Sequence, residues 1–258
     1  MKSIWKFLND REEAISFLLS KPKNVVTPVT FQKIETEIQM LYDFYGLLKA
    51  GDKKFRRKKA FKPYKKLGNM VAEVSLLQQE ESMLSLLFEK DKLPDFKRDI
   101  RRLKEAKREE YFVTVDEKFV HKLNSKKGEL ESWLRNINKK LVQGYLKKKA
   151  KKISKVMLKG EVNASKLDEL RNRLNEYAGL QSLVQKVKTE KDGIAQALKN
   201  WKVQNNSLQF ITGLKESGIF TAVELKLIKK VEVKLLAEES ELVTKVSESI
   251  LQKGSFLG

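Results

Sequence analysis

The wide spacing of the prolines is the feature that most constrains the fold of this chain. The 258 residues contain only four, namely Pro22, Pro28, Pro63 and Pro94. Because proline interrupts a helix, long helices can form only between these positions. In the intervals, apolar residues recur at alternating steps of three and four, as at Phe31, Ile34 and Ile38, which places them on one face of an α-helix. We therefore expect an all-α protein built from packed amphipathic helices.

The same pattern predicts where the helices lie. They are expected at residues 3–20, from Pro28 past Leu48, and at 58–89, 95–110, 129–158, 164–188, 190–214 and 220–252. The helix at 58–89 either begins near Pro63 or is kinked there. Residues 111–128 are expected to form a connection with a helical second half, because YFVTV has β-propensity but no second strand to pair with. Thr221 and Glu224 match a Thr-x-x-Glu capping box, which supports the start of the last helix.

Charge is divided unevenly along the chain. Residues 1–160 hold 39 Lys+Arg against 21 Asp+Glu, whereas residues 161–258 hold 15 against 13, so nearly all of the net charge of +20 lies in the first part. We expect these ranges to be two helical halves, of which residues 1–160 form the strongly basic one. Charge on this scale destabilises a compact chain by self-repulsion. It indicates a partner that carries many negative charges, with solubility as the alternative explanation.

Two runs without acidic residues concentrate this charge. The first, residues 53–66, holds nine basic side chains. Its candidate anion ligands are Arg56, Arg57, Lys58, Lys59, Lys62, Lys65 and Lys66. Arginine binds phosphate oxygens bidentately, lysine acts as a point charge, and a helix amino terminus in the run is expected to add its dipole. Phe55, Phe61 and Tyr64 lie among these cations and either stack on nucleic-acid bases or fill the helical core, and the core is the preferred interpretation.

The second run extends from Arg135 to Lys159 and holds ten basic side chains. Those that share one face of the expected helix are Lys147, Lys148, Lys151, Lys152, Lys155 and Lys159. Like charges four residues apart cost about 0.2–0.5 kcal/mol per pair, so this row favours an anion that lies along it. A third basic segment has acidic neighbours at helical spacing, such as Asp95 near Arg98, and predicts a solvated face of ion pairs.

Composition excludes several classes of function. The chain has no cysteine and a single histidine, His121, which removes disulfides, thiol nucleophiles and metal sites built from these residues. It also lacks a glycine-rich phosphate loop, a dinucleotide fingerprint and a nucleophile elbow. We expect a protein that is not an enzyme and that needs no cofactor. Since no stretch approaches the roughly 18 apolar residues of a spanning helix and no secretory signal is recognisable, we also expect no membrane association and a cytoplasmic location.

The apolar pattern of one helix recurs later in the chain. Phe31, Ile34, Ile38 and Leu41 have counterparts 136 positions later in Leu167, Leu170, Leu174 and Tyr177. Residues 31–78 resemble the first half of the CHAD domain, the conserved-histidine α-helical domain, and residues 167–209 resemble its second half. The resemblance implies two antiparallel helical bundles, related by a pseudo-two-fold axis, that together form one domain. It also implies binding of inorganic polyphosphate in a basic central channel.

The chain departs from this family at the positions of its ligands. Where the family has histidines and basic residues, this sequence carries, among others, Gln32, Glu35 and Asp168. Arg171 matches a family arginine, and Arg173 and Lys202 could contribute at the same implied channel. Because carboxylates repel phosphate, we expect anion binding along the lysine-rich helix faces and not at the family's histidine positions.

These observations predict non-enzymatic binding of inorganic polyphosphate or a similar polyanion through faces rich in lysine and arginine. One alternative is nucleic-acid binding by the same basic patches. Another is a structural or interaction module that has kept the helical bundle and lost its ligand, which would leave a large apolar patch exposed. The sequence carries no pattern that predicts an oligomeric state.

Overall fold

The protein is all-helical, as expected, in the part of the chain that the computed structural model describes. That part comprises residues 2–125, 127–135, 137–157, 163–181, 183–184 and 193–253. Within these ranges the chain forms eleven α-helices and one 3-10 helix, and it forms no strand. None of the helices in these ranges has a stretch long and apolar enough to cross a membrane.

The chain divides into two compact units. The first unit consists of Met1–Leu146 with Gly179–Gln185, and the second of Lys147–Ala178 with Lys186–Gly258. The division falls inside a helix, α8 (Lys139–Met157). The boundary expected from charge, at residue 160, lies outside the described residues.

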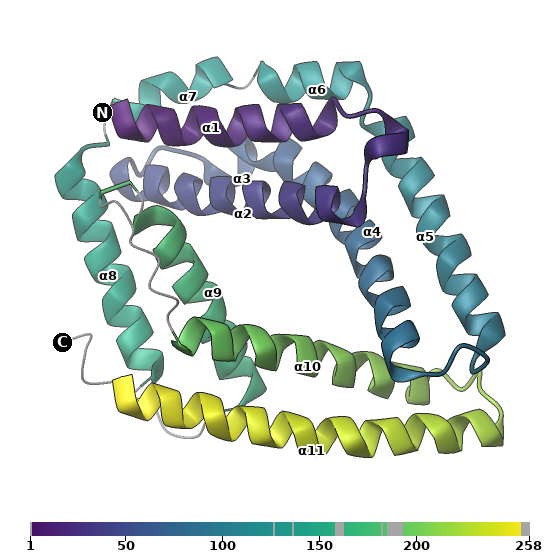
Figure 1. The fold of residues 1–258 in the computed structure, drawn as a ribbon. Helices are drawn as coiled ribbons and strands as arrows, with labels where there is room; N and C mark the ends of the chain where they lie inside the picture. The colour runs from purple at the N-terminus through teal and green to yellow at the C-terminus, as the bar shows by residue number, and fades with distance from the viewer. Residues whose placement is uncertain are drawn as a thin grey trace. The chain divides into compact units, whose positions relative to one another are not determined.

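The first unit is a bundle of helices. Its elements are α1 (Lys2–Leu19), the 3-10 helix η1 (Lys23–Val25), α2 (Pro28–Gly51), α3 (Arg57–Ala60), α4 (Lys62–Leu87), α5 (Pro94–Thr114), α6 (Glu117–Asn124) and α7 (Lys127–Leu134). Helix α2 packs against α1 and α4, and α4 runs antiparallel to α5 (Figure 1). Fully buried side chains from three of these helices, including Leu8, Phe44, Tyr45 and Leu67, form its core. Burial of such apolar side chains is the main driving force for this packing.

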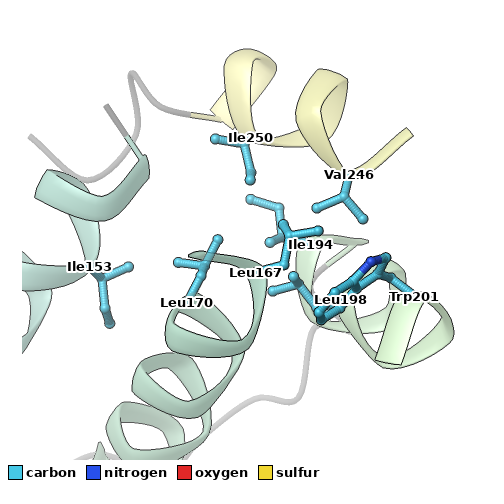
Figure 2. Close-up of a cluster of buried hydrophobic side chains, with 8 residues drawn as sticks. All are labelled: Ile153, Leu167, Leu170, Ile194, Leu198, Trp201, Val246 and Ile250. Carbon is cyan, nitrogen blue, oxygen red and sulfur yellow. The ribbon is translucent and has the colours of Figure 1, made fainter. Parts of the chain in front are cut away.

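The second unit contains the last part of α8, helix α9 (Ala164–Gln181) as far as Ala178, α10 (Gly193–Glu216) and α11 (Ala222–Lys253). Helices α10 and α11 pack as an antiparallel pair (Figure 1). The core shown in Figure 2 is formed by Ile153, Leu167, Leu170, Ile194, Leu198, Trp201, Val246 and Ile250. Trp201 is fully buried, and its indole N–H donates to Glu239 Oε1 at 3.0 Å, so the polar atom of this large ring is satisfied.

Two expected helices are interrupted. The segment predicted at 58–89 contains the short helix α3, a break at Phe61, and then α4. Pro63 lies in the first turn of α4, where its missing N–H costs no hydrogen bond, so the helix begins near the proline and is not kinked by it. The single helix expected at 129–158 is wrong, because α7 ends at Leu134 and α8 begins at Lys139. Asn138 caps α8 by accepting the Leu141 N–H at 2.9 Å, an interaction that starts a new helix.

The connection expected at 111–128 is more helical than predicted. Helix α5 continues through Thr114, and α6 occupies the second half of the segment. Tyr111 is buried against Phe31, with ring centroids 5.1 Å apart. Tertiary packing of this kind overrides the β-propensity of YFVT.

Both ends of the turn between α10 and α11 have specific capping. Gly218, two residues after the end of α10 at Glu216, has φ 71°, a conformation that glycine adopts without strain. The predicted capping box is confirmed, because the Thr221 N–H donates to Glu224 Oε2 at 2.8 Å and the Glu224 N–H donates to Thr221 Oγ1 at 3.3 Å.

Candidate anion-binding site

The lysine row on α8 is exposed. The described members of the predicted row are Lys147, Lys148, Lys151, Lys152 and Lys155, and all five side chains face solvent. None of the five makes an ion pair or hydrogen bond to another described residue through its ammonium group. The sixth predicted member, Lys159, lies outside the described residues.

A neighbouring lysine on the same helix is paired. The Lys149 ammonium lies 2.6 Å from Glu176 Oε1 on α9, and the two side chains are only 20% and 16% exposed. On the inner side of the same helix, Ile153 enters the core of the second unit. The fold therefore supplies a carboxylate to the cation that it buries and leaves the outer row without one.

The basic run at 53–66 divides into two kinds of cation. The exposed members without a side-chain partner among the described residues are Arg56, Lys58, Lys59, Lys62 and Lys65. Arg57 instead lies 3.6 Å from the centroid of the Tyr42 ring and donates from Nη2 to the Tyr42 carbonyl at 2.6 Å. Lys66 lies 5.8 Å from the Phe119 ring centroid. Lys62 and Lys65 lie in the first turn of α4, where the helix dipole favours negative charge, and Arg56, Lys58 and Lys59 lie just before it, at and in α3.

The aromatic residues of this run are core residues. Phe55, Phe61 and Tyr64 are at most 7% exposed. They pack edge-on around Tyr45, with centroid distances of 5.7, 5.6 and 6.3 Å. The suggestion that they stack on nucleic-acid bases is therefore wrong, because no open ring face remains, whereas the preferred interpretation as core is confirmed.

The cations carried over from the family comparison lie in the second unit, and two of the three are neutralised. Arg173 donates from Nε to Glu169 Oε1 at 2.9 Å. The Lys202 ammonium lies 2.9 Å from Asp168 Oδ1. Arg171 is half-buried and makes no such contact with the described residues. Both carboxylates come from α9. Glu169 is four residues before Arg173 on the same helix, whereas Lys202 reaches Asp168 from α10.

Helix α5 is a face of ion pairs, as its acidic neighbours predicted. Arg98 pairs with Asp95 at 2.8 Å, and Arg102 lies 3.6 Å from Asp99. The sequence did not indicate the contribution of α4, from which Glu81 reaches across to α5.

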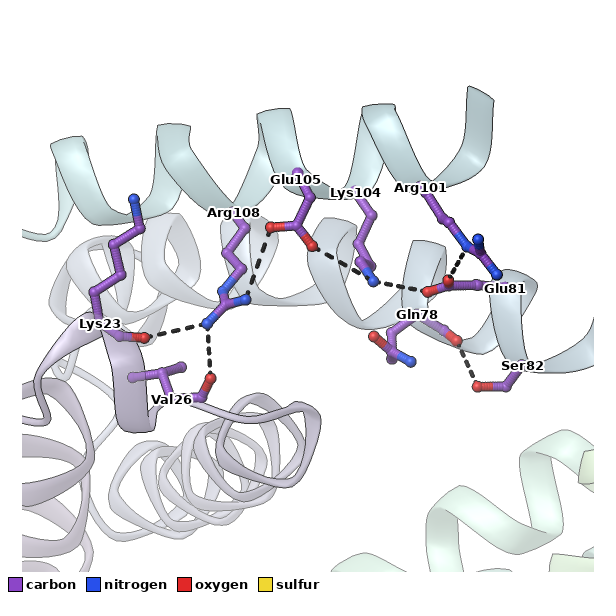
Figure 3. A network of polar contacts seen from close by, with 9 residues as sticks. All are labelled: Lys23, Val26, Gln78, Glu81, Ser82, Arg101, Lys104, Glu105 and Arg108. Carbon is purple, nitrogen blue, oxygen red and sulfur yellow. Dashed lines mark hydrogen bonds and ion pairs between the residues drawn. The ribbon is translucent and has the colours of Figure 1, made fainter. Parts of the chain in front are cut away.

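Glu81 is the centre of the network in Figure 3. Its carboxylate accepts from Arg101 Nε at 2.8 Å and from Lys104 Nζ at 2.7 Å. Glu105 lies 3.5 Å from Lys104 and 3.7 Å from Arg108. Burial by itself would raise the pKa of Glu81, but the hydrogen bonds and charges of Lys104 and Arg101 together lower it below its ordinary value.

Arg108 extends this network to the start of α2. Its Nη2 donates to the Lys23 carbonyl at 3.1 Å and to the Val26 carbonyl at 2.9 Å. The guanidinium therefore ties α5 to the segment that leads into α2 (Figure 3). Its Nε is buried and has no hydrogen-bond partner among the described residues.

A cavity of about 150 Å³ lies beside this network. Its apolar wall is formed by Val26, Pro28, Phe31 and Val74, and its polar wall includes Gln32, Ser75, Gln78, Lys104 and Arg108. Gln32 was noted in the sequence only as a departure from the family's ligand positions. Lys104 and Arg108 were not expected there, because they come from a helix far along the chain.

His121 is exposed on α6. In the described ranges, acidic residues and histidine nowhere gather in the groups of three or more that could hold a metal ion.

Neither family models nor curated proteins give a match to this chain. We therefore infer its function from the residues themselves.

Proposed function

We propose that this protein binds inorganic polyphosphate, or a similar polyanion, without catalysing a reaction. The observation that carries the proposal is the contrast on α8, where Lys149 is paired with Glu176 while the five outer lysines have no carboxylate partner among the described residues. Repulsion within an unpaired row is relieved when an anion lies along it. The row therefore resembles a binding surface more than a solvated face balanced by its own acids.

The shape of the row suits an extended polymer. Lys147 and Lys155 are eight residues apart, which corresponds to about 12 Å along a helix. A single phosphate would contact one or two of these ammonium groups, whereas a chain of phosphates can contact all five. Such binding releases condensed counterions and weakens steeply as salt is added.

The exposed cations near the start of α4 form a second surface of the same kind. Arg56 offers a planar guanidinium for bidentate contact with phosphate oxygens, and Lys58, Lys59, Lys62 and Lys65 add point charges. Helix α4 is 26 residues long and begins at Lys62, so its positive dipole end lies in this surface. We propose the two surfaces as separate contacts for the same class of ligand.

A CHAD-like architecture is part of this proposal. Members of the repeated apolar stripe are buried in both units. They are Phe31 and Ile34 in the first unit and Leu167 and Leu170 in the second. This supports two bundle halves related by a pseudo-two-fold axis. The ion pairs of Arg173 and Lys202 favour the lysine-rich helix faces over the family's channel as the place of binding. We also propose a cytoplasmic location. Disulfides form and persist in oxidising compartments, and this chain has no cysteine to form one.

Nucleic acid is the second candidate ligand, because the same cations could contact its phosphates. Stacking between bases and aromatic rings contributes to the tight binding of single-stranded nucleic acid. The aromatic residues of the basic run are buried, which favours a ligand that consists of phosphate alone.

Binding of fluorescently labelled polyphosphate of defined lengths, followed by anisotropy at rising salt, tests the proposal. We expect affinity to increase with chain length and to fall by at least about tenfold between roughly 50 and 200 mM salt. Unlabelled polyphosphate should displace the probe at a lower phosphate concentration than single-stranded RNA does. Absence of binding at low salt would exclude the function, and stronger competition by RNA would assign the surfaces to nucleic acid.

A further inference from the structure

We propose that the outer face of α11 binds the same face of a second copy of this chain, so that two copies form an antiparallel dimer. The inference does not rest on the proposed function, because this face contains no residue of α8. It rests on the exposed side chains in the middle of α11 and on the charges at either side of them.

One side of α11 is covered within the second unit. Ile228 and Leu235 are buried on this side, and Gln204 of α10 donates from Nε2 to the Leu235 carbonyl at 3.3 Å. Nearer the end of the helix, Val246 and Ile250 enter the core shown in Figure 2. The opposite side of the helix is exposed over its middle turns.

The middle of this outer face is apolar. Val233 and Leu236 are 67% and 49% exposed. Ala237 and Ser240, which are also exposed, continue the same face at helical spacing and leave room for a second helix to approach. Single exposed apolar residues are common on monomeric proteins, so the charges around these residues decide whether the face is a contact.

The exposed charges of α11 differ in sign on the two sides of the apolar residues. Four exposed lysines and no exposed acid lie in residues 222–234, namely Lys226, Lys229, Lys230 and Lys234. Three exposed acids and one exposed lysine lie in residues 238–248, namely Glu238, Glu241, Glu248 and Lys245. The outer face is therefore positive toward the start of the helix and negative toward its end.

Such a face is complementary to itself in the antiparallel orientation. A two-fold axis brings identical surfaces of two copies together. With the axis beside position 235, Val233 of one copy lies opposite Ala237 of the other, and Lys229 lies opposite Glu241. Parallel pairing would place lysines against lysines and acids against acids, which repel each other.

Two effects oppose this contact, and both are small on α11. The net charge of +20 repels a second copy, but residues 161–258 hold only 15 Lys+Arg against 13 Asp+Glu. Glu241 has a competing partner in its own helix, Lys245, at 3.9 Å. Both of these side chains are largely exposed, and an exposed pair of this kind contributes little.

The size of the face indicates a weak dimer. Lys226 and Thr244 are 18 residues apart, which corresponds to about 27 Å along a helix roughly 10 Å wide. Such a contact buries less than about 1,200 Å² over the two copies, which is typical of transient association. We expect dimers at roughly tens of micromolar and above. Polyphosphate binding measured at lower concentrations is binding to the single chain.

Sedimentation equilibrium of the full chain between about 1 and 500 μM tests the association. The mass should rise from that of one 29.9 kDa chain toward twice that value. Val233→Glu should weaken association at least about tenfold, because it buries a charge without a partner. Val113→Glu on α5, where the valine is 78% exposed, is the matched control and should associate like the wild type. A monomer throughout, or equal weakening by both variants, overturns the proposal.

A charge exchange tests the pairing of the two faces. Lys229→Glu and Glu241→Lys should each weaken association at least about fivefold, since each places like charges opposite one another. The chain that carries both changes restores opposite charges at both ends of the contact, and its affinity should return to within about twofold of the wild type. Further weakening in the double variant would contradict the pairing.

Cross-linking tests the orientation, and the absence of native cysteine makes single cysteines specific. A mixture of Val233→Cys and Ala237→Cys chains should cross-link through a short bismaleimide. Val223→Cys, near the start of α11 and 79% exposed, should not cross-link to itself, because the two starts lie at opposite ends of an antiparallel pair. Self-cross-linking at position 223 without any between positions 233 and 237 overturns the antiparallel dimer.

Discussion

Lys149 and Glu176 form an ion pair between α8 and α9, with the ammonium nitrogen 2.6 Å from the nearer carboxylate oxygen. Both side chains are largely shielded from water, at 20% and 16% exposure. Lys148 and Lys151, on the same helix, are exposed and unpaired among the described residues. Lysines of one short segment therefore differ in environment, because Lys149 is paired and shielded while its neighbours are exposed and unpaired among the described residues.

Replacing Lys149 should affect stability more than binding. In Lys149→Gln the Glu176 carboxylate stays shielded without its cation, and the free energy of unfolding should fall by about 1–3 kcal/mol. Urea denaturation measures this loss. Lys148→Gln, the matched control, should leave stability unchanged and weaken polyphosphate binding. If the two variants showed the same stability, the pair would have no structural role.

Arg56 and Arg57 provide a second matched comparison. Arg57 packs on the Tyr42 ring, and a Cβ added at Gly46 would lie 3.4 Å from its Cζ, so its guanidinium lies against the protein and is only partly exposed. Arg57→Gln should lower stability by about 1–2 kcal/mol through the lost hydrogen bond and cation–π contact. Arg56→Gln should leave the melting temperature unchanged and weaken polyphosphate binding more than Arg57→Gln does. The reverse order would show that Arg57 is the ligand.

The network at Glu81 should make stability depend on pH. Its pKa is lowered in the folded protein by Lys104 and Arg101, against the opposing effect of burial. A depressed pKa contributes stability above the unfolded value, and that contribution is lost as the pH falls through the folded value. We expect Glu81→Gln to be less stable than the wild type at pH 7, and the difference to shrink as the pH falls below the ordinary carboxylate value of 4.5. Thermal unfolding from pH 7 to pH 3 measures it, and a difference that grows with acid would contradict the assignment.

The start of α8 depends on one side chain. Asn138 Oδ1 accepts the Leu141 N–H at 2.9 Å, and loss of such a cap costs about 0.5–2 kcal/mol. Asn138→Ala should therefore lower the unfolding free energy by that amount, while Asn138→Asp should retain most of it. Calorimetry of both variants checks this, and equal losses would show that the hydrogen bond does not stabilise the helix.

The parts of the fold that depend on local sequence were predictable. The stripe of Phe31, Ile34 and Ile38 is buried as its spacing indicates, because helical period alone determines which side chains share a face. The capping box of Thr221 and Glu224 is local in the same sense. The acidic neighbours of Arg98 and Arg102 on α5 likewise indicated ion pairs.

The parts that depend on distant residues could not be read from spacing. Glu81 lies 20 and 23 positions from its partners Arg101 and Lys104, and the sequence therefore did not indicate it as their acceptor. The break before α8 was missed because an asparagine inside an apolar pattern is compatible with a helix until its side chain captures a backbone N–H. Which lysines are free is likewise a property of the packed helices, as Lys149 shows.

The most direct test of the central claim compares three exposed lysines on α8 with three on α11. The change of Lys147, Lys151 and Lys155 to Gln removes the same charge as the change of Lys226, Lys229 and Lys230 to Gln, and all six side chains are exposed. If the unpaired row on α8 binds polyphosphate, the first variant should lose at least about tenfold in affinity and show a shallower dependence on salt, while the second changes by about twofold or less. Equal losses in the two variants would show that only net charge matters and would contradict a binding surface on α8.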